Sequence, residues 1–448
     1  MEGRRVSQHC AWAAALAICA AGTAAAQTDP GVRPGANGAG FAISGLSTNE
    51  QAFFDAGRDD FAEEEGIGDG LGPRFNLDSC GGCHSQPDMG GTSPAVNPQF
   101  DIATAFGAHN AVPPFITRNG PVREARFKTL PNGAPDGGVH ALYVISQRID
   151  STGSAASCNI LQDNFAQQQA NGNVIFRIPT PVFGLGLLEE ITDQTLILNL
   201  NANAGAKAAR GITGRFNHNG NDGRISRFGW KAQNPTGLVF SGEAYNVEMG
   251  ITNEAFQTER DETPECQFAT LPNDTSNPDG ATGIDTISAI EKFAFFMRFL
   301  DQPTPSTTVP GGANSIIQGR NNFVNIGCAL CHTPSLTTGN ATVLALRNKQ
   351  ANLFSDLALH NMGPGLADDI VQGEARGDEF RTAPLWGLGK RIFFLHDGRT
   401  TNLLTAIQAH ASNGNARYPA SEANSVVNAF NALTVQQKQD LLNFLRSL

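Results

Sequence analysis

Two short motifs in the sequence have the residue types and spacing for covalent attachment of haem. Their residues are Cys80, Cys83 and His84 in the first motif, and Cys328, Cys331 and His332 in the second. Two thiols three positions apart can add to the two vinyl groups of one haem, and the adjacent imidazole then lies beneath the iron as a ligand. Cys-x-x-Cys also occurs in zinc sites and in redox-active thiol pairs. Two copies of the whole motif, neither with a second Cys or His pair nearby, favour two c-type haems.

The first residues have the pattern of an export signal. Arg4 and Arg5 precede an apolar run that begins at Cys10, and three alanines at 24–26 supply the small residues of a cleavage site. The run is too short to anchor the chain as a membrane helix. We therefore expect residues 1–26 to be a signal peptide and the mature protein to be periplasmic, without a membrane anchor.

Two cysteines lie outside both the signal and the motifs. They are Cys158 and Cys266. An exported compartment favours a disulfide between them, but their distance cannot be deduced from the sequence, so a bridge and two separate thiols both remain open.

Length and charge limit the architecture and the partners. A chain of 448 residues exceeds one average core, which favours two domains. The formal net charge of -11 argues against nucleic acid or an anionic membrane as partner, because both require a basic surface. A small basic electron carrier fits better.

An internal repeat indicates that the two motifs belong to duplicated units. Gly-Arg-Asp-Asp-Phe at 57–61 precedes the first motif, and Gly-Arg-Asn-Asn-Phe at 319–323 precedes the second. Downstream, Pro-Val-Phe-Gly-Leu-Gly at 181–186 is matched by Pro-Leu-Trp-Gly-Leu-Gly at 384–389. The spacing is longer in the first copy, which indicates an insertion within 111–176.

Apolar periodicity predicts a mainly helical chain with long loops. Helices are expected at 288–300, as the opening helix of the second domain, and at 426–448. Short strands are expected around 139–146, and 272–283 is expected to be a linker. The predicted division is a signal peptide at 1–26, an N-terminal haem domain with a strand-rich insertion at 27–283, and a C-terminal cytochrome c-like haem domain at 284–448.

Four further stretches carry a family resemblance. They are Gly-Ala-His-Asn-Ala-Val-Pro-Pro-Phe at 107–115, Arg-Phe-Gly-Trp-Lys-Ala at 227–232, Phe-Ser-Asp-Leu-Ala-Leu-His-Asn-Met-Gly at 354–363 and Phe-Leu-His-Asp-Gly-Arg at 394–399. With them the chain resembles the bacterial di-haem oxidoreductases, often labelled peroxidases or thiol oxidoreductases. That family is related to the di-haem cytochrome c peroxidases and to the di-haem enzyme that matures methylamine dehydrogenase.

The resemblance implies a sixth ligand for the second haem. In the peroxidases, a His-Asp-Gly turn precedes a helix that supplies this ligand fourteen positions after the histidine. Here the turn begins at His396, and fourteen positions later stands His410. The resemblance therefore favours His410, with His360 and Met362 as the alternatives.

The resemblance also implies residues for the first haem. Peroxidases of this kind keep a Glu of a Glu-Met-Gly tripeptide over the first iron, about twenty residues after a Trp between the haems. Here Glu248 opens such a tripeptide eighteen residues after Trp230. A carboxyl group there could exchange protons with bound peroxide. Glu243 competes with Glu248 for this role, and Trp230 is either an electron relay or an ordinary packed indole.

Other positions are weaker candidates. His109 could bind the first iron in a resting state, or it could be a structural residue of a turn. Arg399 is a candidate for holding a haem propionate. The peroxidases bind calcium through a Thr-x-Pro before the His-Asp-Gly turn, and the corresponding segment at 391–395 lacks it, so calcium is not expected.

Three kinds of function fit these residues. In the first, the chain is a peroxidase-like enzyme that activates peroxide or oxygen at the first haem and relays electrons through the second. In the second, it is a non-catalytic di-haem electron-transfer cytochrome. In the third, it oxidises an organic or thiol substrate. The expected partners are a small-molecule oxidant and a small electron-donor protein such as a cytochrome c or a cupredoxin.

Overall fold

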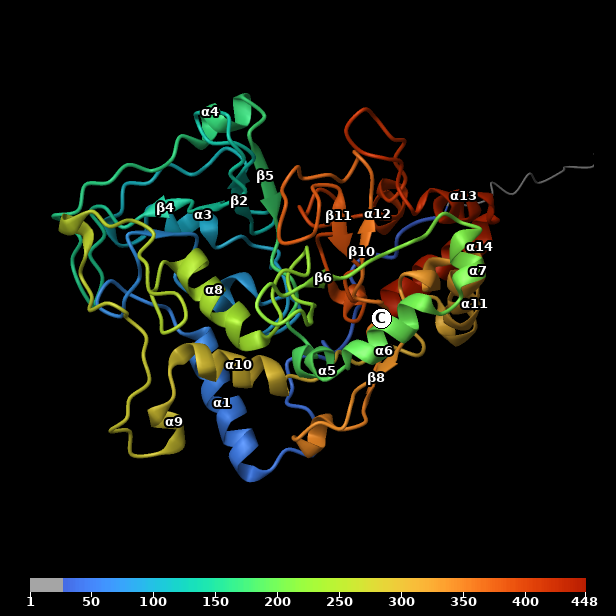
Figure 1. Ribbon diagram of the computed structural model, residues 1–448, viewed down its shortest axis with the longest axis horizontal. Helices are drawn as coiled ribbons and strands as arrows, with labels where there is room; N and C mark the ends of the chain where they lie inside the picture. Colours follow the sequence, from blue (N-terminus) through green and yellow to red (C-terminus); the bar gives the residue numbers. More distant parts are fainter. Residues whose placement is uncertain (1–26) are drawn as a thin grey trace, which may run out of the picture.

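The computed structural model describes residues 27–448 (Figure 1). The signal peptide expected at 1–26 lies outside the described residues. The described part of the chain has 14 α-helices; 32% of its residues are helical, with the 3-10 turns included, and 11% lie in short strands and isolated bridges. The expectation of a chain richer in helix than in strand, with long connecting loops, is confirmed.

The helices fall into two sets along the chain. The first set is α1 (Thr48–Ala62), α2 (Cys80–Cys83), α3 (Gln99–Ile102), α4 (Phe165–Ala170), α5 (Leu185–Glu189), α6 (Asp193–Asn201), α7 (Ala204–Ala208), α8 (Gly237–Met249), α9 (Gly283–Thr286) and α10 (Ala289–Phe299). The second set is α11 (Gly312–Ile326), α12 (Leu403–Ala409), α13 (Asn424–Ala432) and α14 (Val435–Ser447).

The strands are short and all pair antiparallel. The largest sheet has three strands in the order β3 (Val139–His140), β2 (Glu124–Phe127), β5 (Val174–Arg177). The two-stranded pairs are β1 (Arg74–Phe75) with β4 (Tyr143–Val144), β6 (Asn217–His218) with β7 (Ile225–Ser226), β8 (Leu336–Thr337) with β9 (Gln350–Ala351), and β10 (Leu359–Asn361) with β11 (Glu379–Arg381). The strands expected around 139–146 are present as β3 and β4.

The first hydrophobic core is built around α10, which packs against α1 and α8 (Figure 1). Ile290, Phe293, Phe296 and Met297 recur at helical spacing on α10, and all are buried. Ser288 begins the helix with a capping box, as its sequence pattern predicts. The helix itself is where we expected it, but it completes the first core and does not open the second half.

The second core is built around α11 and α14, with α13 beside them. The single helix expected at 426–448 is two helices, because the backbone is extended at Leu433 and the Thr434 hydroxyl accepts a hydrogen bond from the amide of Gln437. This side-chain cap starts α14 as a new helix.

The same local packing occurs in both cores. Gly57 of α1 lies where an added Cβ would meet the Lys292 carbonyl oxygen of α10 at 2.1 Å, and Gly319 of α11 lies where a Cβ would meet the Asp440 carbonyl oxygen of α14 at 2.0 Å. Only glycine permits such a close approach of two helix backbones. The repeated glycines at 57 and 319 therefore mark equivalent helix pairs, and α10 corresponds to α14.

The two halves of the chain are interlocked. The first core also takes in Leu346, Leu353 and Trp386, which lie beyond the second motif. At the other end, Asp29 forms a buried ion pair of 2.7 Å with Arg446 of α14. A division of the chain at 283/284 therefore does not coincide with the division between the cores.

A disulfide joins Cys158 to Cys266 and resolves the alternative left open by the sequence. It ties the strand-rich insertion to the loop that follows α8. None of the helices within 27–448 combines the length and apolar character that a membrane span would need.

Candidate functional site

The first motif lines a cavity of about 150 Å³ inside the first half of the chain. Cys80 and Cys83 lie on the single turn of α2, and His84 follows directly. From the opposite elements, Trp230 and Glu248 also line this cavity. The structure thus brings together all the residues that the sequence predicted for the first haem, apart from His109, which is exposed and outside the cavity lining.

The second motif lines a cavity of about 250 Å³ beside the second core. Cys328, Cys331 and His332 contribute to its wall, and so does His410 at the end of α12. The four motif cysteines are not joined in disulfides. Each cavity therefore offers two thiols and a histidine, as covalent attachment of haem requires.

Three histidines of these cavities have the same hydrogen-bond pattern. Nδ1 lies 2.9 Å from the Gly91 carbonyl oxygen in His84, 3.0 Å from that of Phe354 in His332, and 2.8 Å from that of Ala406 in His410. A carbonyl only accepts, so Nδ1 carries the proton and Nε2 keeps a free lone pair. Burial lowers the pKa of His84 and of His332 to about 4. These rings are therefore neutral and suited to bind iron through Nε2.

His360 has a different environment, although it also lines the second cavity. Its Nδ1 lies 2.8 Å from a Glu422 carboxylate oxygen, and its Nε2 lies 3.0 Å from one of Asp356. Burial alone would lower its pKa, but the neighbouring Cys331 and Asp356 raise it well above the ordinary range. A ring that donates from both nitrogens has no lone pair for a metal.

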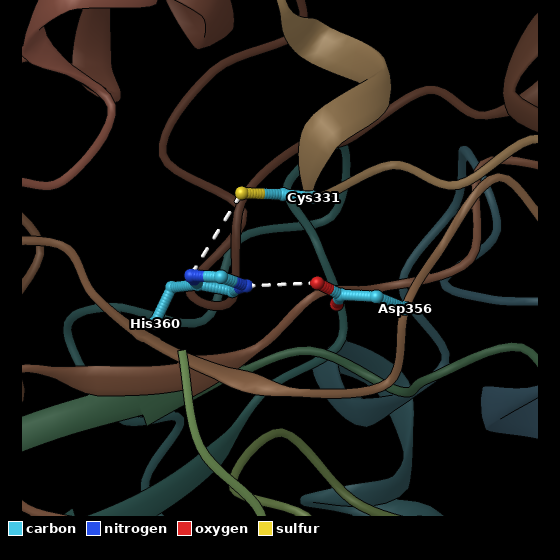
Figure 2. A group of neighbouring side chains, drawn as sticks. All are labelled: Cys331, Asp356 and His360. Atoms are coloured by element: carbon cyan, nitrogen blue, oxygen red, sulfur yellow. Dashed lines mark hydrogen bonds and ion pairs between the residues drawn. The ribbon is translucent and has the colours of Figure 1, made fainter. Parts of the chain in front are cut away.

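A metal cluster is therefore not the best description of Cys331, Asp356 and His360. Their ligand atoms lie within 4.8 Å of one another, and Figure 2 shows His360 between the sulfur and the carboxylate. The contacts of His360 with Asp356 and Glu422 are those expected of a protonated imidazole between two carboxylates. This arrangement favours His410 over His360 as the residue facing an iron in the second cavity. Met362 lines that cavity as well.

Trp230 stands in the wall between the two cavities. It contributes to the lining of both, together with Ile178 and Pro179. Its indole nitrogen donates to the Ile178 carbonyl oxygen at 2.9 Å, and its ring meets that of His396 edge-on at 6.3 Å. The resemblance implied a position between the two haems, and Trp230 does lie between the two cavities; its half-buried N–H also has a partner, as in an ordinary packed indole.

Glu248 lies in the last turn of α8 with its carboxyl group in the first cavity. The Asn76 amide donates to it at 2.7 Å, and it also shares a hydrogen bond with the carboxyl group of Glu124. Burial, followed by the charge of Glu124, raises the pKa of Glu248 to about 8. Glu243 lines the same cavity but is hydrogen-bonded to Asn234.

Two buried arginines in the second cavity have unused donors. Arg381 Nη1 and Arg391 Nε have no hydrogen-bond partner among the described residues, and no carboxylate pairs with either side chain there. Burial lowers the pKa of each to about 10. Such cations are stable when an anion completes the site, and haem propionates have the required charge and oxygen acceptors.

The structure does not bring Arg399 to either cavity. Its guanidinium is 41% exposed, pairs with Asp397 at 2.7 Å and donates to the Gly365 carbonyl oxygen. The motif places it just after a turn, where the side chain extends along the surface. Arg381 and Arg391, unlike Arg399, line the second cavity.

Sequence reasoning missed several residues of the site: Asn76, Glu124, Arg126, Arg381 and Arg391. The Glu-Ala-Arg-Phe run of β2 was a usable signal, because alternate strand residues point to the same face. Arg391 also precedes the apolar run at 392–395, where a charge is unusual. Asn76 had no signal, since its role depends on two contacts distant in sequence.

One protein-family model matches most of the chain. The family model described as "Di-haem oxidoreductase, putative peroxidase" matches residues 133–448. The chain belongs to this di-haem oxidoreductase family. The second motif lies within the matched range and the first lies before it.

Solved structures show more distant likenesses. The structure titled "Kuenenia stuttgartiensis Hydrazine Synthase Pressurized with 20 bar Xenon" is 16% identical, with a TM-score of 0.24, over 37% of this chain and 56% of that chain. A "MauG-like protein associated with microbial copper homeostasis" is 18% identical, with a TM-score of 0.31, over 60% of this chain and 90% of that one. This chain thus spans little more than half of the hydrazine synthase chain. No curated protein matches it.

Membership of a di-haem family implies haem cofactors, and the two cavities fit them. Each has a neutral histidine beside two free thiols. The second also has two arginines without anions, and in the first Arg177 has a buried Nε without a partner among the described residues.

Proposed function

We propose that this chain is an exported di-haem c-type oxidoreductase with peroxidase-like chemistry in its first cavity. The observation that carries the proposal is the difference between the two cavities. Among the described residues, the first is lined by a single histidine, His84, and by the three glutamates Glu124, Glu243 and Glu248, whereas the second is lined by the histidines His332, His360, His396 and His410. A haem in each cavity would supply a redox-active iron, open to substrate in the first and closed by two imidazoles in the second.

The residues proposed to hold the two haems differ in kind. Cys80 and Cys83 would form the thioether bonds of the first haem and Cys328 and Cys331 those of the second, with His84 and His332 as the respective iron ligands. His410 would supply a second imidazole to the iron in the second cavity, and Arg381 and Arg391 would pair with propionates. No calcium is required by this account.

Glu248 is the residue proposed to move protons. With a pKa of about 8 it is protonated at neutral pH, so it can give a proton to an oxygen that enters the cavity and recover it afterwards. Asn76 holds the other carboxyl oxygen in place at 2.7 Å. Glu243 is engaged by Asn234 and is therefore the weaker candidate.

Trp230 is proposed to couple the two cavities. Reduction of one peroxide to two water molecules consumes two electrons and two protons, so the first cavity must be resupplied with electrons from outside. An indole in contact with both cavities shortens the path between them. With a net charge of -11 the chain is suited to a basic electron donor, such as a small cytochrome c or a cupredoxin.

The test of this proposal is Glu248→Gln. The substitution keeps size and hydrogen bonding but removes the titratable proton, so peroxide-dependent oxidation of a reduced donor should slow by about 10²- to 10⁴-fold while both haems stay bound. Glu243→Gln is the matched control on the same helix and should cost less. Wild-type turnover in Glu248→Gln would contradict the role of this residue. If the wild-type protein does not react with peroxide and both of its haems are six-coordinate, the result favours a non-catalytic electron-transfer function.

A further inference from the structure

We propose that Glu124 and Glu248 form a carboxyl pair that holds one shared proton on the wall of the first cavity, with Glu124 as a positioning residue that keeps Glu248 protonated. This inference deepens the proposed function and rests on it only for the role of the proton in peroxide reduction. Whether the two carboxyl groups share a proton can be tested in a protein that is not turning over substrate.

Glu248 and Glu124 both line the first cavity, and their carboxyl groups lie within hydrogen-bonding reach of each other. A hydrogen bond between them requires a proton, because ionised carboxylates can only accept. One of the two groups must therefore carry a proton. Two adjacent negative charges in a buried site would also repel each other strongly, which is the reason that paired carboxyls share a proton.

The neighbours indicate which group is ionised. Arg126 lies two positions from Glu124 on the same face of β2, and its Nε donates to Glu124 at 2.6 Å. Burial would raise the pKa of Glu124, but the charges of Arg126 and Arg177 hold it below the ordinary range. Glu124 is thus the carboxylate of the pair, and Glu248 is the acid.

One further feature keeps the proton on Glu248. It lies in the last turn of α8, where the negative end of the helix dipole disfavours a carboxylate. The Asn76 side chain is fixed from the other side, since its oxygen accepts from the Leu142 amide at 2.8 Å while its nitrogen donates to Glu248. Asn76 therefore orients the carboxyl group, although its N–H by itself lowers the pKa of Glu248.

The charged and titratable groups around Glu248 come from several elements. They are Glu124 and Arg126 on β2, Arg177 on β5, Arg260 in the loop after α8, Glu243 on α8 itself, and Cys80 and Cys83 on α2. The two cysteines would no longer titrate once bonded to haem. Glu124 and Arg126 are the groups whose removal should shift Glu248 in opposite directions.

The experiment follows the carboxylic acid C=O band of the resting holoprotein by infrared spectroscopy as a function of pH. The band of Glu248 is identified as the one lost in Glu248→Gln. In Glu124→Gln, the repelling charge is gone and Arg126 is left without its partner. The pH at which the band disappears should therefore fall by about one unit or more, a tenfold loss of proton affinity. In Arg126→Gln it should rise. Glu243→Gln is the control and should lower it by less than Glu124→Gln does.

The outcomes separate the two proposals. The carboxyl pair is overturned if no band at neutral pH depends on Glu248, or if Glu124→Gln leaves its midpoint unchanged. If Glu124→Gln does not fold, an unchanged or lowered midpoint in Arg126→Gln overturns it equally. Should the infrared shifts appear as expected in a protein that does not turn over peroxide, the pair stands and the peroxidase function fails. If the enzyme is active, the pH at which its rate falls on the alkaline side should shift in each variant together with the pH at which the Glu248 band disappears.

Discussion

The hydrogen-bond partner of each histidine decides what that histidine can do in this protein. His84, His332 and His410 each give Nδ1–H to a backbone carbonyl and keep Nε2 free, whereas His360 is held by a carboxylate on both sides. The sequence identified the first two through the motif spacing. It reached His410 only through a family resemblance, because Ala406, its partner, is an ordinary helical residue. Glu422, whose contact argues against His360 as a ligand, lies 62 residues away from it, so that contact could not be deduced from the sequence.

His410→Gly should convert one low-spin haem to a high-spin state, because the second iron would lose an axial imidazole. The measurement is the electronic and electron paramagnetic resonance spectrum of the oxidised protein. His218→Gly is the control, since His218 is 43% exposed and pairs with Glu374. An unchanged low-spin signal in His410→Gly would transfer the ligand role to Met362 or His360.

Arg391→Met should lower the midpoint potential of the second haem. A buried positive charge beside a propionate stabilises the reduced, more negative state, and its removal at an effective dielectric constant of about 20 corresponds to roughly 40 to 90 mV, or about 1 to 2 kcal/mol. Arg399→Met removes the same charge from the exposed guanidinium and should have little effect in a potentiometric titration. Equal shifts in the two variants would argue against the pairing of Arg391 with a propionate.

At the level of elements, the sequence predicted several helices and strands but not their partners. Capping residues and periodicity located α10. Its packing on α1 depends on Gly57, which faces Lys292 of α10 and precedes that residue by 235 positions. The repeat at 57–61 and 319–323 carried that information, because both glycines serve one function, the close contact of two helices. The break between α13 and α14 escaped prediction because one threonine cap outweighed a continuous apolar pattern.

Gly319→Ala should destabilise the protein, because its Cβ would meet the Asp440 carbonyl oxygen of α14 at 2.0 Å and force the two helices apart. The expected loss is about 1 to 3 kcal/mol in the free energy of unfolding. Gly205→Ala in α7 is the matched control, since its Cβ would meet nothing within 4 Å and alanine favours the helix by about 0.5 to 1 kcal/mol. Urea unfolding measures both, and equal stability of the two variants would contradict the close helix contact.

For the whole molecule, the two cores are duplicated but not independent. Asp29 near the start of the described chain pairs with Arg446 near its end, and residues after the second motif complete the first core. The disulfide between Cys158 and Cys266 closes a further long loop. Sequence reasoning inferred a duplication from the repeat and drew the boundary between the halves at a loop, because exchange of segments between cores has no local signal. Trp230 lines both cavities in this interlocked arrangement.

The central claim is that each cavity holds one covalently attached haem, and haem stoichiometry tests it most directly. The protein should be produced in cells that mature c-type cytochromes, denatured, and assayed by pyridine haemochrome absorbance and intact mass. Wild type should retain two haems per chain, and the variants Cys80→Ala/Cys83→Ala and Cys328→Ala/Cys331→Ala should each retain one. A wild-type chain without two covalent haems, or a variant that still carries two, would contradict the account.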